Sequence, residues 1–166
     1  MTVRSIVRFP DARLRTPALS VTMFDDALAA LAGDLLDTLR AAPGIGITAP
    51  HIGVLMRVVV IELTPQDGVR TYINPQVVSA SAELMRHAEG SVSMPGVSEE
   101  VERPAQVRVA YQDLAGMPRA EDAEGLLAIC LQHEIDQIDG LFWLQRLSRL
   151  KRERVVKRYE KLARGA

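Results

Sequence analysis

Cysteine is almost absent from this chain of 166 residues. Cys130 stands alone, which excludes a disulfide framework and a paired-cysteine metal knuckle. No apolar run approaches the roughly eighteen residues that a membrane span needs, and residues 1–17 contain no continuous apolar stretch of the kind found in signal peptides. The sequence also has no internal repeat, low-complexity segment or Gly/Ser linker. These absences predict a cytoplasmic protein without a membrane partner.

The composition is that of an ordinary globular protein, with 48% hydrophobic and 25% charged residues. A chain of this length suits one domain, here residues 1–166, with one core. The net charge of −1 is unevenly spread, because nine Lys or Arg and only two Glu lie between Arg146 and Arg164. We expect a basic C-terminal helix at about residues 147–162.

The hydrophobic pattern predicts an α+β fold, in which short strands are separated by helices. Leucines recur at spacings of three and four in residues 25–40, and Asp25 and Asp26 occupy the first turn, where the helix dipole favours anions. Residues 124–137 form a second predicted helix. Short β-branched runs predict strands at Met56–Leu63, Thr71–Ile73, Val77–Val78 and Val107–Tyr111.

The second predicted helix carries the sequence QHEIDQ at residues 132–137. Metallohydrolase helices of the HExxH type place two histidines on one face, with the glutamate beside the metal-bound water. Here His133 and Glu134 are present, but Gln137 stands at the second histidine position. On its own this pattern also fits an ordinary His-Glu pair on an amphipathic helix.

Two further segments give the pattern a context. Residues 44–53 read GIGITAPHIG, residues 89–95 read EGSVSMP, and INP and DGLF flank the motifs at 73–75 and 139–142. In this order and spacing the three motifs resemble those of peptide deformylases, GxGxAAxQ, EGCLS and QHExDH. The resemblance runs from about Ile6 to Lys157. It implies a fold of short antiparallel strands around a central HExxH-type helix, followed by a C-terminal helix.

The resemblance also implies a function and a set of roles. Peptide deformylases use a divalent metal, commonly iron, to activate water that removes the N-formyl group from a nascent peptide. The family resemblance makes Glu134 the proton shuttle and Val92 the position whose N–H completes the oxyanion site. The positions that match the substrate cleft are Gly44, Ile45, Gly46, Ile47, Glu89 and Gly90. A peptide added to this strand edge is the expected ligand.

Four positions depart from the family motifs: Thr48 replaces alanine, His51 glutamine, Ser91 cysteine and Gln137 histidine. The ligand positions are therefore Ser91, His133 and Gln137, of which only His133 is a strong donor for iron, zinc or nickel. We expect no tightly bound cofactor at this place, although the family uses such metals. Without the metal, water is not acidified and the developing oxyanion loses its Lewis acid.

His51 has three possible roles. Its ring N–H can replace the glutamine amide as an oxyanion donor, it can join His133 and Glu134 around a shifted metal, or it can be a hydrogen-bonded cleft residue without chemistry. Outside this set, we read His87 as an exposed polar residue and Cys130 as a core residue. Arg103 is expected to pair with Glu89 or Asp136, or to lie on the surface.

Three functions remain open. The first is a deformylase relative whose cleft binds an N-terminal peptide of the N-formylmethionyl type, or a small ligand, with deformylation weak or lost. The alternative is an active peptide deformylase or another N-acyl amide hydrolase that uses Glu134 with His51 and His133 in a rebuilt site. The third is a protein that contacts the ribosome through its basic helix, whose cations suit RNA phosphates.

Overall fold

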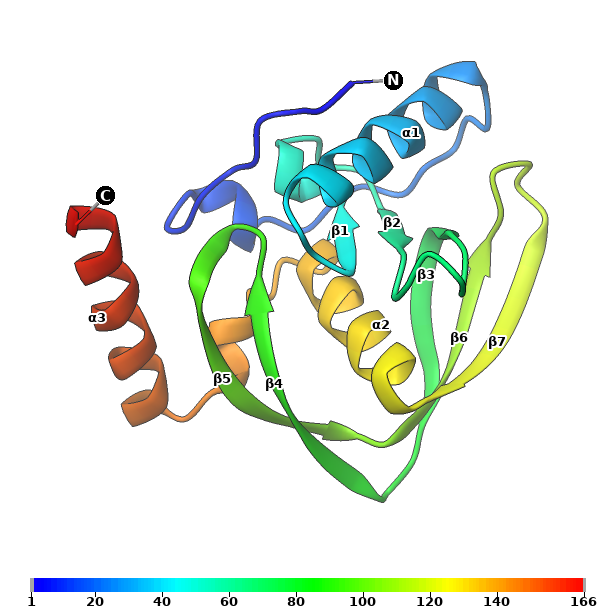
Figure 1. Ribbon diagram of the computed structural model, residues 1–166. Coiled ribbons are helices and arrows are strands. Elements are labelled where there is room, and N and C mark those ends of the chain that lie inside the picture. The colour runs from blue at the N-terminus through cyan, green and yellow to red at the C-terminus, as the bar shows by residue number, and fades with distance from the viewer. Residues whose placement is uncertain (1, 166) are drawn as a thin grey trace.

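The computed structural model describes residues 2–165, and it confirms the α+β class. One helix precedes the strands, most of the strands follow one another directly, and two helices end the chain (Figure 1). The helices are α1 (Asp26–Ala41), α2 (Gly125–Ile138) and α3 (Arg149–Gly165), and the 3-10 turns are η1 (Ala12–Arg15), η2 (Ala49–Ile52) and η3 (Trp143–Arg146). The strands are β1 (Gly46–Thr48), β2 (Val58–Ile61), β3 (Arg70–Ala80), β4 (Leu84–Ser91), β5 (Met94–Pro104), β6 (Gln106–Gln112) and β7 (Pro118–Glu124).

The strands form two antiparallel sheets. The larger has five strands in the order β1-β2-β3-β6-β7, and the smaller is the long hairpin of β4 and β5. β1 is the short edge strand of the larger sheet, where Gly46 lies opposite Ile61 in the register with β2. Because β1 has a strand on one side only, its other edge remains open to a further extended segment.

The helix α2 occupies the centre of the fold, with the larger sheet on one side and the β4–β5 hairpin on the other (Figure 1). Its residues Leu131, Ile135 and Ile138 pack in one core cluster with side chains of β2, β3 and β6. Nearly every residue from Ala128 to Ile138 is buried. A helix buried on most of its surface holds any polar side chain it carries away from bulk water.

The first helix is built as the leucine spacing predicts. The side chain of Asp25 caps α1 by accepting a hydrogen bond of 3.0 Å from the backbone N–H of Leu28. Leu28, Leu35 and Leu39 are buried in a second cluster with residues of β1 and β2. This packing holds β1 between α1 and α2.

The N-terminal segment crosses from one sheet to the other. The N–H of Val7 donates to the carbonyl of His51 at 2.7 Å, and the N–H of Phe9 donates to the carbonyl of Ser93 at 2.9 Å. His51 lies in η2, next to β1, and Ser93 lies in the turn of the β4–β5 hairpin. The segment therefore ties the edge of the larger sheet to the tip of the hairpin.

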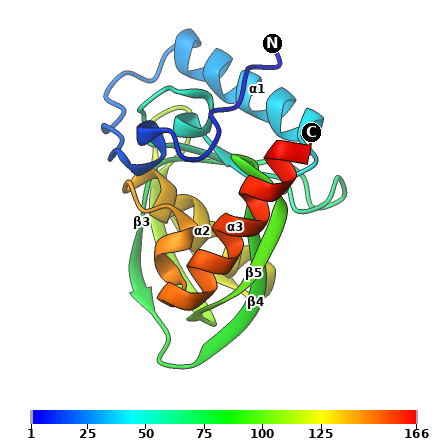
Figure 2. The ribbon, with the colours of Figure 1, turned by 90° about the vertical axis from the view of Figure 1, so that its left-hand side faces the viewer.

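The last helix, α3, packs on the outer side of β5 (Figure 2). It begins at Arg149 rather than near residue 147 and extends to Gly165. Val155 is its buried residue, and it joins Phe142 and Trp143 in a third core cluster. The other side chains of α3 are exposed or half-buried.

The strand predictions were right in place but incomplete. Thr71–Ile73 and Val77–Val78 belong to one strand, β3, which continues through Asn74 at φ 52° and a bulge before Gln76. The hairpin β4–β5 and the strand β7 were missed, because many of their side chains are polar and exposed. No helix within residues 2–165 is long and apolar enough to cross a membrane.

Because β1 lies close to α2, a side chain at Gly46 is expected to destabilise the fold. A Cβ atom at this position would lie 2.9 Å from Sγ of Cys130 and 3.1 Å from Oε2 of Glu134. We expect Gly46→Ala to lower the free energy of unfolding by about 1–3 kcal/mol, the usual cost of overpacking. Chemical denaturation measures this value. Gly165→Ala, where a new Cβ meets nothing within 4 Å, is the control and is expected to leave stability unchanged.

Candidate functional site

A cavity of about 640 Å³ lies between the open edge of the larger sheet, α2 and the end of the β4–β5 hairpin. All three histidines of the chain line it. The segment before β1 and the end of β4 supply most of its walls, and α2 supplies its floor. The predicted site residues among its lining are Gly44, Ile45, Gly46, His51, Glu89, Gly90, Ser91, Val92, His133 and Glu134. Ile47, the middle residue of β1, is instead fully buried in the core cluster with α1 and β2.

A buried ion network holds His133 in place. Arg103 of β5 makes two hydrogen bonds to the carboxylate of Glu89, at 2.6 and 2.8 Å. Glu89 in turn accepts a bond of 2.8 Å from Nδ1 of His133. Burial alone would raise the pKa of Glu89, but the bonds from Arg103 and His133 outweigh it and lower this pKa to about 2. With Nδ1 engaged, only Nε2 of His133 is free to face the cavity.

The network continues behind α2. Arg103 also donates to Asp136 at 2.8 Å, and Arg146 of η3 makes two bonds to the same carboxylate, at 2.8 and 2.9 Å. Arg103 is 3% exposed, so its charge depends on these partners. The expected pairing with Glu89 or Asp136 is therefore confirmed, and it involves both acids. The guanidinium of Arg103 thus ties β4, β5 and α2 together, and Arg146 adds η3 through the carboxylate of Asp136.

Glu134 lines the cavity on α2. Its Oε1 lies 3.8 Å from Nε2 of His133, and its buried Oε2 has no partner among the described residues. Burial raises the pKa of Glu134 to about 7, although His133 opposes the shift. A carboxyl group with this pKa can take up or release a proton near neutral pH, as a general base requires.

His51 is held by the residue at the end of β1. Its Nδ1 accepts a bond of 2.9 Å from the backbone N–H of Thr48 and lies 3.0 Å from the Thr48 hydroxyl. The side chain is 1% exposed, and Nε2 has no partner within residues 2–165. Burial, helped by the charge of His133, lowers the pKa of His51 to about 3. The ring is therefore neutral at physiological pH.

The residues at the three ligand positions do not fit a catalytic transition metal. Gln137 does not line the cavity, because its amide donates to the backbone carbonyl of Leu14 at 2.7 Å. Ser91 offers a hydroxyl that accepts a bond of 3.1 Å from the N–H of Ser93. Only His133 remains as a strong donor. A shifted site is not formed either, since no three His, Cys, Asp or Glu side chains of residues 2–165 are grouped to hold an ion.

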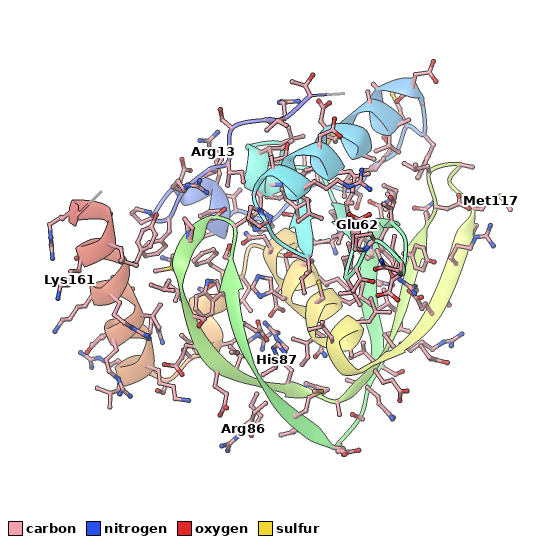
Figure 3. The ribbon with its side chains drawn as sticks, viewed as in Figure 1. Arg13, Glu62, Arg86, His87, Met117 and Lys161 are labelled. Atoms are coloured by element: carbon pink, nitrogen blue, oxygen red, sulfur yellow. The ribbon has the colours of Figure 1, made fainter. Side chains whose placement is uncertain are left out.

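The remaining predictions concern residues outside this centre. His87 is exposed, as expected, but it also lies at the rim of the cavity on β4 (Figure 3). Cys130 is buried in the core cluster of α2, as expected, and its thiol also lines the cavity. Lys161 and other basic side chains of α3 point outward (Figure 3). Contact of this face with RNA stays a prediction.

Arg8 is a charged cavity residue that the sequence did not indicate. Arg8, from the N-terminal segment, reaches the rim of the cavity and donates a hydrogen bond to the carbonyl of Val92. This bond joins the N-terminal segment to the wall that carries the second motif. No spacing rule links two residues so far apart in the chain, so the sequence held no signal for it.

Comparison with known proteins decides the family. The family model of polypeptide deformylases matches residues 3–153. The chain belongs to this family. It is 65% identical to a protein named peptide deformylase-like from Bradyrhizobium diazoefficiens, over 99% of this chain and 97% of the relative. It is 42% identical to a peptide deformylase of the same strain, over 100% of this chain and 99% of the relative.

Solved deformylases share the fold of this family member. The crystal structure of a peptide deformylase from Legionella pneumophila matches with a TM-score of 0.93 and 38% identity, covering 98% of this chain and 96% of the other. A peptide deformylase from Synechococcus elongatus, in complex with actinonin, matches with a TM-score of 0.90 and 35% identity, covering 93% and 86%. The expected deformylase fold is confirmed.

The buried network predicts that substitution of two arginines of the β4–β5 hairpin lowers the free energy of unfolding by very different amounts. Arg103→Met leaves Glu89 and Asp136 with a buried, poorly compensated charge, and we expect it to lower the free energy of unfolding by about 3–5 kcal/mol. Arg86→Met removes an exposed arginine, whose pairs with Glu100 and Glu102 lie on the surface, and is expected to cost less than about 1 kcal/mol. Urea denaturation of both variants tests this. Equal losses would contradict a central role for Arg103.

The lowered pKa of Glu89 also predicts that the protein loses stability as the solution becomes acidic. Its pKa is lowered from 4.5 to about 2 in the folded protein. The stabilisation is therefore fully present above about pH 4.5 and is lost as the pH falls towards 2, where the folded carboxylate takes up its proton. Thermal unfolding of the wild type and of Glu89→Gln between these values measures the effect. A slope that is unchanged in the variant would assign the acid limb to other carboxylates.

Proposed function

We propose that this protein binds an N-terminal peptide of the N-formylmethionyl type in its cavity and that its deformylase activity is weak or lost. The observation that carries the proposal is the side chain of Gln137. Where the family motif has a histidine ligand, this side chain is turned to the carbonyl of Leu14 and away from the cavity.

The cavity supports binding of an extended peptide. β1 has an open edge, and Gly44, Ile45 and Gly46 leave room for a backbone to approach it. Added strands gain main-chain hydrogen bonds at such an edge, and pockets select the side chains. Much of the lining is apolar, with Val92, Leu126 and Ile129 among its residues. This lining suits an unbranched apolar side chain such as that of methionine.

The loss of activity is supported by the chemistry of the donors. A serine hydroxyl is not deprotonated near neutral pH and is a poor replacement for a thiolate. The side chain of Gln137 is turned to the carbonyl of Leu14 and does not line the cavity, so its amide oxygen is not presented to an ion there. A single imidazole, His133, does not make the three-ligand site that leaves one position open for water.

The presence of two relatives in one bacterial strain agrees with the proposed loss of activity. Bradyrhizobium diazoefficiens has a protein named peptide deformylase-like, 65% identical to this chain, and another named peptide deformylase, 42% identical. A cell that already has a deformylase does not require that activity from the second protein. The deformylase-like group is free to keep the cleft and change the chemistry.

One observation favours the alternative of a metal-free amide hydrolase. Glu134 combines a pKa of about 7 with an unpartnered, buried oxygen in the cavity. It can accept a proton from water that attacks an N-acyl group. General-base catalysis alone contributes about 10²–10⁴-fold, far below the acceleration of most enzymes, which begins at about 10⁶-fold. Slow turnover is therefore the most that this arrangement supports.

Formate release tests the proposal directly. The substrate is formyl-Met-Ala-Ser, assayed anaerobically with iron, nickel or zinc supplied in turn. We expect Ser91→Cys, Gln137→His to bind one metal and to release formate at least about a hundredfold faster than the wild type, since it restores the three ligands. The single variants are the matched controls, because each restores only one ligand. Metal content is measured on the same samples.

Binding is measured on the same protein by calorimetry with formyl-Met-Ala-Ser. A wild type that binds the peptide without cleaving it supports the proposal. Efficient turnover by the wild type with stoichiometric metal would overturn it. Slow turnover that survives a chelator and disappears in Glu134→Gln would favour the metal-free hydrolase. Absence of any binding would show that the cleft has lost its peptide ligand.

A further inference from the structure

Arg8 is the one arginine or lysine among the described residues that line the cavity. Its side chain is exposed, and Nη1 donates a hydrogen bond to the carbonyl of Val92. Within residues 2–165 this is the side chain's one hydrogen bond, and no carboxylate lies within ion-pair distance of it. A guanidinium has five N–H groups, so the edge formed by Nε and Nη2 is left for a ligand.

Other arginines of the chain hold carboxylates with this same edge. Nε and Nη2 of Arg103 donate to Glu89 at 2.6 and 2.8 Å, and those of Arg40 donate to Glu62 at 3.0 and 2.8 Å. Two parallel N–H···O bonds of this kind match the planar shape of a carboxylate. Arg8 therefore presents, at the rim of the cavity, a pairing edge that its counterparts fill with an acid.

The backbone on both sides of Arg8 is held in place. The N–H of Val7 donates to the carbonyl of His51 at 2.7 Å, and the N–H of Phe9 donates to the carbonyl of Ser93 at 2.9 Å. Val7 is buried in the third core cluster, and Phe9 packs against that cluster. Because its neighbours are fixed, the guanidinium needs little rearrangement to bind a ligand, which lowers the entropic cost of binding.

The charges of the cavity differ between its floor and its rim. Glu134 lies on the floor, and Glu89 is already held by Arg103 and His133. A ligand carboxylate on the floor would face these two acidic side chains, whose negative charge opposes it. At the rim the same carboxylate would meet the unpaired cation of Arg8. The distribution favours a ligand that is neutral at its buried end and negative at its outer end.

We propose that Arg8 selects ligands that carry a carboxylate at the outer end of the segment bound in the cavity, and that Nε and Nη2 hold this carboxylate. Its source is the C-terminus of a short peptide or the side chain of an acidic residue a few positions from the buried end. The cavity volume of about 640 Å³ suits a ligand of this size. This inference rests on the proposed peptide-binding function and names a second feature of the ligand.

Two pairs of peptides test the proposal by calorimetry. Formyl-Met-Ala-Ser is compared with its C-terminal amide, and formyl-Met-Ala-Glu amide is compared with formyl-Met-Ala-Gln amide. In at least one pair the wild type is expected to bind the carboxylate peptide about three- to tenfold more tightly, as a charge-assisted hydrogen-bonded pair allows. A preference in the first pair assigns the carboxylate to the C-terminus, and one in the second pair assigns it to an acidic side chain. Raising the salt from about 0.05 M to about 0.5 M should reduce the preference.

Substitutions of Arg8 separate ion pairing from a structural role. Arg8→Met removes the cation and should abolish the preference, while the affinity for the two uncharged peptides stays within about twofold. Arg8→Lys keeps the charge without the planar edge and should retain only part of the preference. Arg86→Met is the matched control and should keep all of it, since this exposed arginine of β4 pairs with Glu100 and Glu102 on the surface.

A spectroscopic signal of the wild type provides an independent test. The Nε–H resonance of Arg8, assigned by its absence from Arg8→Lys, should move when the preferred carboxylate peptide is added and stay in place with its uncharged counterpart. A resonance that moves equally with both peptides would contradict a pair between Arg8 and the carboxylate.

The outcomes distinguish this inference from the function on which it rests. If no peptide binds to the folded wild type, the proposed peptide-binding function is wrong and the inference falls with it. If peptides bind without a preference in either pair, or if Arg8→Met keeps the preference, the cleft is a peptide site but Arg8 does not select its ligand. If Arg8→Met weakens carboxylate and uncharged peptides alike, Arg8 only supports the wall at Val92 and the proposal is wrong. Circular dichroism confirms that each variant is folded.

Discussion

The buried guanidinium of Arg103 is the interaction on which the rest of the site depends. It carries one positive charge into a region that also holds Glu89, Asp136 and, in the cavity, Glu134. Through Glu89 it sets the orientation of His133, and through Asp136 it is linked to Arg146 of η3. Charges removed from water require partners with good geometry. The network therefore holds β4, β5 and α2 together around the cavity through hydrogen bonds between side chains.

Local signals in the sequence sufficed for the helices and for the motif positions. The leucines of α1 and the QHEIDQ segment of α2 lie on helices, as predicted. These helices could be predicted because spacing and capping depend only on neighbouring residues. The β4–β5 hairpin escaped prediction, since its alternation is hidden by charged and exposed residues such as Arg86 and Glu102. Long-range contacts for which the family resemblance gives no precedent were also out of reach. Nothing near Gln137 in the sequence indicates that its amide binds Leu14, 123 positions away.

The family resemblance predicted which residues meet at the cavity, but their chemistry could be read only from the structure. His51 and Thr48 were two separate departures from a motif until their hydrogen bonds joined them. The resemblance marked Glu134 as a proton shuttle, but the burial that raises its pKa to about 7 is a property of the folded structure. These properties arise from packing, which no single sequence displays.

The hydrogen bond from Gln137 to Leu14 also determines the solution conditions under which the two segments it joins stay together. It joins α2 to the N-terminal segment by an amide and a carbonyl, groups that neither air nor a chelator attacks. A thiolate and a ferrous ion at the same centre would both be open to oxidation. The bond that closes the N-terminal segment onto α2 is therefore insensitive to the redox state of its surroundings, and it fixes that segment to the helix that carries His133 and Glu134.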